Sequence, residues 1–315
     1  MNHLAKILIV LVVSGICCQG IFLIADHQLE KYNVHKKERL DEIILGHLPF
    51  DVLFLGSSKT HTGINPYYVD SVAGCNSYNL GIEGGRINEF KIIWDAYLQN
   101  HPKPKLLILS VNLFEFDLRR GFFNHTQYFP YLENNVISKG LDEYGHRTSL
   151  HRFLPFLRMS DYDDYTRNNC IKGMMHQTEI DAGNFQYKGF LSNGKKTIHS
   201  SLQLPPKEDA VVSTGSVELL KEMIEACKKD SIKVLLVYLP EYKHLIRNNT
   251  PNAEAVLKRF QEISDTYQVK FLRHDALELC QDTKLFANAG HLNTAGSIVY
   301  SKYLGEVVNN ELSKQ

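Results

Sequence analysis

A serine pair behind an apolar run is the first place in this chain where residue types and spacing can do chemistry. Residues 51–56 (DVLFLG) have the composition of a buried strand, and Ser57 and Ser58 follow at once. A serine at a strand-to-helix turn stands clear of the sheet edge, with backbone N–H groups facing whatever its oxygen attacks. Ser58, next to the start of the following helix, is therefore the candidate nucleophile. An ordinary turn is the competing interpretation.

A serine nucleophile needs a base, and His291 is the candidate. It lies in the segment 286–293 (FANAGHLN), directly before a predicted helix that starts after Asn293 and ends near Leu312. A histidine placed there can reach back over the sheet edge to Ser58 and act as general base and then as general acid in acyl transfer. Taken alone, His291 fits equally well as a capped surface residue.

Two further segments offer hydrogen-bond donors for the charge that develops on an attacked carbonyl. Residues 78–85 (YNLGIEGG) form a predicted turn before a helix, where a glycine lets the backbone approach a ligand and leaves an N–H free. Asn112 ends the apolar run 105–111 (KLLILSV), so its amide can point across the sheet edge at the same oxyanion. A glycine turn that needs positive φ and a strand-end cap are the structural alternatives.

These residues need a framework that brings them to one edge. From Phe50 onward, short apolar runs alternate with amphipathic stretches, which is the pattern of a parallel sheet covered by helices. The clearest predicted strands are 51–56, 105–111, 232–239 and 269–272, and the clearest predicted helices are 86–99, 214–228 and the one after Asn293.

Between about residues 113 and 212 this alternation is lost, and the stretch is rich in aromatic residues. We interpret it as an insertion with some helical structure, because so long a simple loop is rare in a compact fold. Since it leaves the sheet directly after Asn112, it is expected to cap the carboxyl edge of the sheet. The candidates nearest to a substrate pocket are then Phe114, Phe116 and Arg119.

Taken together, the four segments resemble the SGNH/GDSL hydrolase superfamily, in which a serine, a glycine, an asparagine and a DxxH pair follow in that order. The matching residues are Ser58, Gly84, Asn112 and His291. The resemblance covers about residues 50–113 and 230–312. It implies an α/β three-layer sandwich with a parallel sheet, Ser58 as nucleophile and His291 as base. It also implies an oxyanion hole made by the N–H groups of Ser58 and Gly84 and the side chain of Asn112.

Two positions depart from the family pattern. Ser57 stands where an aspartate is common, which the GSS-type members tolerate, and Asn288 stands where the catalytic acid is expected. That acid orients the imidazole and stabilises the imidazolium, and its replacement by asparagine in a serine protease costs roughly ten-thousand-fold in turnover. The chain is then a Ser-His dyad enzyme, an enzyme that uses another carboxylate such as Asp282, or a protein with the fold and little catalysis.

The N-terminal segment 7–25 carries no charge and is long enough, at about 28 Å as a helix, to cross a bilayer once. We expect residues 1–25 to be a membrane anchor, with a cleaved signal segment as the alternative, and residues 26–49 to be a juxtamembrane linker or helix. Residues 50–315 then form the SGNH-like domain outside the cytoplasm. The basic residues after the span favour the opposite orientation, but the proposed chemistry suits the cell envelope.

The composition disfavours other functions. Lys+Arg and Asp+Glu are balanced at 35 each, so no net charge attracts nucleic acid. No cysteine or histidine spacing suggests zinc, and no metal or cofactor is expected. The sequence looks most like the envelope branch of the SGNH/GDSL superfamily. This resemblance implies a serine esterase or O-acyltransferase that acts on an acyl ester, commonly acetyl, of a cell-envelope carbohydrate. The alternative is a noncatalytic envelope protein that binds polysaccharide or assists surface-polymer assembly with partner proteins.

Overall fold

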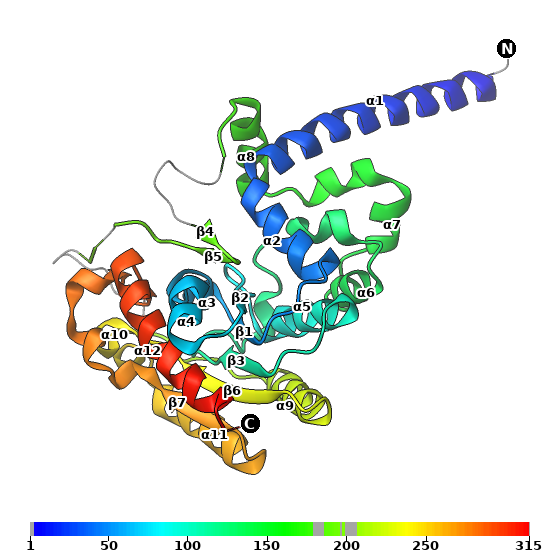
Figure 1. The fold of residues 1–315 in the computed structure, drawn as a ribbon. Coiled ribbons are helices and arrows are strands. Elements are labelled where there is room, and N and C mark those ends of the chain that lie inside the picture. The colour runs from blue at the N-terminus through cyan, green and yellow to red at the C-terminus, as the bar shows by residue number, and fades with distance from the viewer. Residues whose placement is uncertain (1–2, 179–185, 196, 199–206, 315) are drawn as a thin grey trace. The chain divides into compact units, whose positions relative to one another are not determined.

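The computed structural model describes residues 3–178, 186–195, 197–198 and 207–314 (Figure 1). The chain divides into two compact units: unit 1 is Met1–Asp41 with Asn124–Ala182, and unit 2 is Glu42–Phe123 with Gly183–Gln315. All four sequence blocks lie in unit 2. The predicted insertion is shared, since its middle part belongs to unit 1 and its two ends belong to unit 2. Its role as a cap over the sheet edge stays a prediction.

A five-stranded parallel sheet is the centre of unit 2. Its strands are β1 (Val52–Leu55), β2 (Ser77–Asn79), β3 (Leu106–Ser110), β6 (Lys233–Tyr238) and β7 (Lys270–Arg273), in the order β2-β1-β3-β6-β7. Strands β4 (Gln186–Tyr187) and β5 (Phe190–Leu191) form a separate hairpin. When only the five sheet strands are numbered along the chain, their order is 2-1-3-4-5, that of a doubly wound fold. Ligands of such sheets bind beyond the carboxyl ends at the point where the strand order reverses, here between β1 and β3.

Helices cover both faces of this sheet, which confirms the predicted α/β sandwich. On one face α4 (Pro66–Ala73) and α12 (Thr294–Leu312) pack against each other. On the other lie α5 (Ile87–Asn100) and α9 (Thr214–Lys229), together with α11 (Ala253–Thr266), as right-handed crossovers require (Figure 1). The core under α4 and α12 includes Val52, Phe54, Val69, Ile108, Leu235, Val237, Tyr300 and Leu304.

The remaining elements of unit 2 are short. They are α3 (Ser58–Gly63), α10 (Leu245–Asn248), the hairpin β8 (Phe286–Asn288) and β9 (His291–Leu292), and the 3-10 turns η1 (Leu118–Arg120), η4 (Tyr242–His244), η5 (His274–Ala276), η6 (Glu278–Gln281) and η7 (Thr283–Leu285). The start of α12 is fixed by Asn293, whose Oδ1 accepts the Gly296 N–H at 3.0 Å and whose Nδ2 donates to Lys284 O at 2.7 Å. This cap holds the segment that carries His291 against η7.

Unit 1 is helical. Its elements are α1 (His3–Tyr32), α2 (Val34–Leu45, which runs into unit 2), η2 (His125–Tyr131), α6 (Asn135–Glu143), α7 (Thr148–Phe153), η3 (Pro155–Asp161) and α8 (Asp164–Met174). By length and composition α1 can cross a membrane. The C-terminal part of α1 packs against α8 and η3, and Phe22 is buried there.

Gly56 allows the close approach between the first turn of α3 and the end of β3. A Cβ built on Gly56 would lie 2.1 Å from Ser110 Oγ and 2.2 Å from Thr60 Oγ1. Real Cβ atoms do not come that close, so any side chain at this position would push α3 away from β3. The glycine is therefore required by packing, at the turn that presents the two serines.

We expect Gly56→Ala to lower the free energy of unfolding by about 1 to 3 kcal/mol, because the added methyl group overpacks the contact with Ser110 and Thr60. Trp94 is the single tryptophan and is fully buried in unit 2, so its fluorescence reports urea unfolding of the detergent-solubilised chain. Gly215→Ala in α9 is the matched control and should change stability by less than about 1 kcal/mol. Equal unfolding midpoints for the two variants would contradict this view of Gly56.

Candidate active site

The two serines of the first block have different surroundings. Ser57 is the N-cap of α3; its Oγ accepts the Lys59 N–H at 3.4 Å, and its side chain is buried. Ser58 is the first residue of the helix, and its Oγ lies 2.8 Å from Nε2 of His291, although 233 positions separate the two residues. The Ser57 side chain therefore caps helix α3, whereas the Ser58 side chain faces His291.

A short hairpin holds the histidine. His291 begins β9, and Asn288 ends β8. Asn288 Oδ1 accepts three N–H groups at 3.0 Å each, from the backbone of Gly290, the backbone of His291 and Nδ1 of the His291 ring. An amide oxygen can only accept, so this pattern places the ring proton on Nδ1. Nε2 is then the acceptor for the Ser58 hydroxyl, which is the tautomer that a general base needs.

The electrostatics of His291 follow from burial and from the missing acid. Burial lowers the pKa of His291 to about 4, and the charge of Lys59 acts in the same direction. The ring is thus neutral at pH 7 and ready to accept a proton, but a base with so low a pKa holds the proton weakly. Asn288 orients the ring and supplies no countercharge. Asp282, the other carboxylate considered from sequence, is the exposed N-cap of η7 and accepts the Lys284 N–H at 2.9 Å.

Backbone hydrogen bonds join the second block to the first. Ile82 N–H donates to Gly56 O at 2.8 Å, which keeps the second block next to the first, and Gly85 N–H closes a turn onto Ile82 O at 3.0 Å. Gly84 sits in this turn with φ +65°. Within the described residues, the N–H groups of Ser58 and Gly84 donate to no protein acceptor. Both are available to an oxyanion.

The Asn112 side chain is engaged elsewhere. Its Nδ2 donates to Glu115 Oε1 at 2.7 Å and to Ser110 Oγ at 3.2 Å, so both amide hydrogens have acceptors. Its Oδ1 is buried and has no partner among the described residues. Turning the amide over would set Oδ1 against Glu115, which as a carboxylate can only accept, so an ionised Glu115 favours the orientation with Nδ2 toward it. A role for Asn112 as an oxyanion donor, which stays a prediction, needs one of these two bonds to open.

Glu115 and Lys59 are site residues that sequence reasoning missed. Glu115 is buried, accepts the backbone N–H of Asn112 at 3.0 Å and contacts the Ser57 hydroxyl. Burial raises the pKa of Glu115 despite these hydrogen bonds. Lys59 Nζ lies 5.6 Å from the centre of the Tyr238 ring and acts electrostatically on both Glu115 and His291. A glutamate three residues after Asn112 and a lysine beside Ser58 carried no sequence signal of their own.

Asn193 connects the part of the site that carries Ser58 with the part that carries His291. Asn193, which lies in the described end of the predicted insertion, donates through Nδ2 to Thr62 Oγ1 of α3 and to Leu292 O of β9, both at 2.9 Å. Thr62 Oγ1 in turn donates to Ser58 O at 3.0 Å. One amide thus connects the helix that bears Ser58 with the strand that begins at His291.

The predicted pocket residues are only partly at the surface. Phe116 was predicted to line the pocket, but its side chain is fully buried. Its ring centre lies 4.8 Å from that of Phe260, so Phe116 belongs to the core of unit 2. Phe114 is half-buried, and Arg119 is exposed with its Nε 2.9 Å from Asp117 Oδ1. The half-exposed aromatic residue next to the second block is Phe123, because a Cβ on Gly84 would lie 2.5 Å from its ring.

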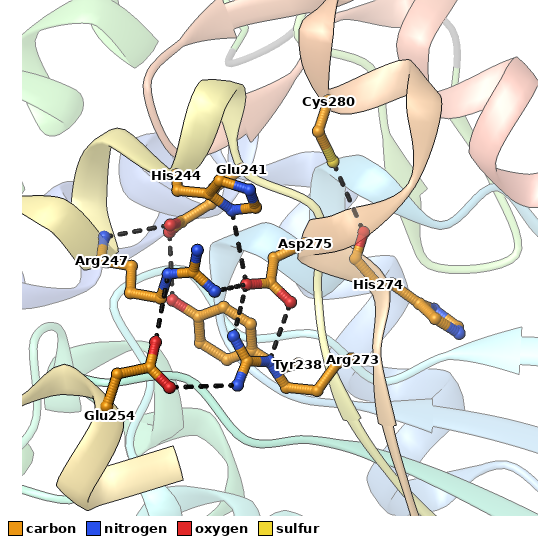
Figure 2. Close-up of polar contacts among 9 residues, drawn as sticks. All are labelled: Tyr238, Glu241, His244, Arg247, Glu254, Arg273, His274, Asp275 and Cys280. Carbon is orange, nitrogen blue, oxygen red and sulfur yellow. Dashed lines mark hydrogen bonds and ion pairs between the residues drawn. The ribbon is translucent and has the colours of Figure 1, made fainter.

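A buried charge cluster lies at the ends of β6 and β7 (Figure 2). Asp275 accepts Arg247 Nη1 at 2.8 Å and Arg273 Nη2 at 2.7 Å, and its side chain is fully buried. Glu241, also fully buried, accepts the Tyr238 hydroxyl at 3.1 Å and the Arg247 backbone N–H at 3.0 Å. Asp275 is thus paired with two arginines, and Glu241 is held by neutral hydrogen-bond donors.

The cluster reaches the site through the backbone. Tyr242, next to Glu241, donates its N–H to Ala289 O at 2.9 Å. Ala289 lies between Asn288 and His291, so the loop after β6 holds the hairpin in place. The polar cluster of Figure 2 is therefore connected to the hairpin that carries His291.

The order of the strands and the contact of Ser58 with His291 agree with the arrangement that the resemblance of the sequence to SGNH/GDSL hydrolases led us to expect. The chain is similar in fold to a GDSL-like lipase from Bacteroides thetaiotaomicron, at 12% identity over 82% of this chain and 88% of the lipase, with a TM-score of 0.38. It is also similar to a catalytic mutant of an acetylxylan esterase from Geobacillus stearothermophilus, at 12% identity over 82% of this chain and 94% of the esterase, with a TM-score of 0.41. No family model and no curated protein matches the chain. Such distant similarities carry no argument about the site, which rests on its own geometry.

We predict that Asn288→Asp raises the pKa of His291 from about 4 toward its ordinary value or above, because a carboxylate replaces the amide oxygen 3.0 Å from Nδ1. A 1H-15N NMR titration of the imidazole measures this shift. In the unaltered chain His291 binds a proton more readily when the protein is unfolded than when it is folded. The free energy of unfolding should therefore fall as the pH drops from about 6.5 to about 4. The substitution should remove that loss. Asn288→Ala is the control, and an unchanged pKa in Asn288→Asp would show that the ring is held by another group.

Proposed function

We propose that this protein is a serine esterase or O-acyltransferase that works through a Ser58-His291 dyad. The observation that carries the proposal is the 2.8 Å contact between Ser58 Oγ and His291 Nε2, with Nδ1 of the same ring held by Asn288. A hydroxyl that donates to a neutral imidazole in a fixed tautomer is the arrangement that activates serine as a nucleophile.

The reaction follows from these contacts. Ser58 Oγ attacks the carbonyl carbon of an ester while its proton passes to Nε2 of His291, and the negative charge moves to the carbonyl oxygen. The N–H groups of Ser58 and Gly84 hold that oxygen. When the carbonyl re-forms, the leaving alcohol takes the proton from Nε2 and an acyl-Ser58 remains. Water or a second hydroxyl then attacks the acyl group with His291 again as base, which regenerates Ser58.

The proposed substrate is an acylated carbohydrate of the cell envelope, with acetyl as the transferred group. This part of the proposal rests on the resemblance of the sequence blocks to envelope members of the superfamily. The apolar helix α1 supports a membrane anchor. We place unit 2 outside the cytoplasm because the proposed chemistry suits the cell envelope. Water as acceptor gives an esterase, and a sugar hydroxyl gives an acyltransferase.

A noncatalytic role in polysaccharide binding or surface-polymer assembly is the second candidate. Two observations favour it: Asn288 brings no charge to His291, and the Asn112 amide is bound to Glu115 and Ser110. In that case the dyad geometry would be retained without turnover.

Labelling with a fluorophosphonate probe distinguishes the two candidates. We expect the detergent-solubilised chain to be labelled at Ser58, and Ser58→Ala to lose the label together with hydrolysis of p-nitrophenyl acetate, by roughly a thousandfold or more. Ser57→Ala should keep the label, with a helix-cap loss of about 1 kcal/mol in stability. Label in Ser58→Ala but not in Ser57→Ala would reverse the assignment. Folded protein with neither label nor turnover would favour the noncatalytic candidate.

A further inference from the structure

A second group of reactive side chains lies in unit 1 and includes no residue of the four sequence blocks. His125 begins η2, His146 follows α6, and Asp161 ends η3. One ligand atom from each of these residues lies within 4.8 Å of the other two. Along the chain, His146 follows His125 by 21 positions and Asp161 follows His146 by 15, so no local sequence motif marks the three residues. Only the fold brings them together.

Their contacts show a built cluster. His125 Nε2 lies 3.2 Å from Asp161 Oδ2, and the rings of His125 and His146 stack with centres 3.9 Å apart. His151 Nε2 is 3.9 Å from the same carboxylate oxygen, and its Nδ1 is buried without a partner among the described residues. Three imidazoles thus surround one carboxylate.

The surrounding elements hold these side chains in place. Phe129 packs edge-on against the rings of His125 and His151, with centres 5.6 and 5.0 Å away. The start of α7, just after His146, is fixed by Asp142, which accepts the Thr148 N–H at 2.8 Å and the Thr148 hydroxyl at 2.9 Å. His146 N–H donates to Leu141 O at 3.1 Å.

The cluster opens onto a cavity of about 530 Å³ whose lining includes His125, His146, His151 and Asp161. A space of this size beside the three side chains leaves room for water or a small ligand. Three protein ligands with one open position are the arrangement of catalytic zinc sites, and two histidines with one carboxylate also suit other first-row divalent ions.

We propose that His125, His146 and Asp161 bind one divalent transition-metal ion, Zn²⁺ foremost, with an open coordination position toward this cavity. Ligand bonds of about 2.0 to 2.2 Å place the ligand atoms of a tetrahedral ion about 3.3 to 3.6 Å apart. Only atoms that now lie farther apart than this, within the 4.8 Å limit, have to approach one another. This site belongs to unit 1 and is independent of the proposed acyl transfer at Ser58.

Metal binding by the full-length chain in detergent tests the proposal. After treatment with EDTA and dialysis, Zn²⁺ titrated by calorimetry should bind at one ion per chain with a Kd below about 1 μM. Co²⁺ should give the visible absorption of a four- or five-coordinate site with nitrogen and oxygen ligands. His125→Ala, His146→Ala and Asp161→Asn should each weaken Zn²⁺ binding at least tenfold.

The control is His176→Asn, which removes an exposed imidazole of unit 1 at a left-handed position that asparagine tolerates. It should bind Zn²⁺ as the unaltered chain does. Circular dichroism checks that each variant is folded, and Zn²⁺ should raise the melting temperature of the unaltered chain and of His176→Asn only. Absence of binding in the folded, unaltered chain, or equal affinity in the three cluster variants and the control, would overturn the proposal.

Discussion

The contact between the end of β1 and the end of β3 is the constraint on which the rest of the site depends. Parallel pairing places Leu55 beside Leu109, so Gly56 and Ser110 follow side by side. Because Gly56 has no Cβ, α3 can begin directly over this contact, where Ser57 caps the helix and Ser58 turns outward. The strand order reverses at this same point, which leaves space above it. A serine held there by packing needs no flexible loop to present it.

The charges of the site are arranged unusually around that serine. The buried carboxylate next to it, Glu115, is bound to Asn112 and Ser57 and does not face the imidazole. The group that does face His291 Nδ1 is neutral, and the nearby cation Lys59 disfavours the imidazolium. If a substrate draws the Asn112 amide toward its own oxygen, Glu115 loses a donor while buried, which costs free energy. Binding and the ionisation of Glu115 are therefore coupled.

Sequence patterns predicted the parts of this structure that depend on local composition. The apolar runs at β1, β3 and β6 were readable because buried parallel strands lack polar alternation. The three-residue strand β2 (Ser77–Asn79) has no such run and was missed. Ser58 and His291 could be placed because each adjoins a predicted element. Asn193, Glu115 and the histidine cluster of unit 1 could not, because their roles depend on contacts between distant segments. Phe116 was misplaced, since an aromatic residue after a strand can turn inward as readily as outward.

The division of the chain has a consequence for the order in which it folds. Unit 1 takes its first part from residues 1–41 and the rest from residues 124–182, with a large piece of unit 2 made in between. At ribosomal rates of about 5 to 20 residues per second, the far end of α1 waits on the order of ten seconds for α8 and η3, its packing partners. During that interval Phe22 and the residues around it have no native neighbours. We therefore expect the C-terminal end of α1 to be open to non-native contacts until α8 has been synthesised.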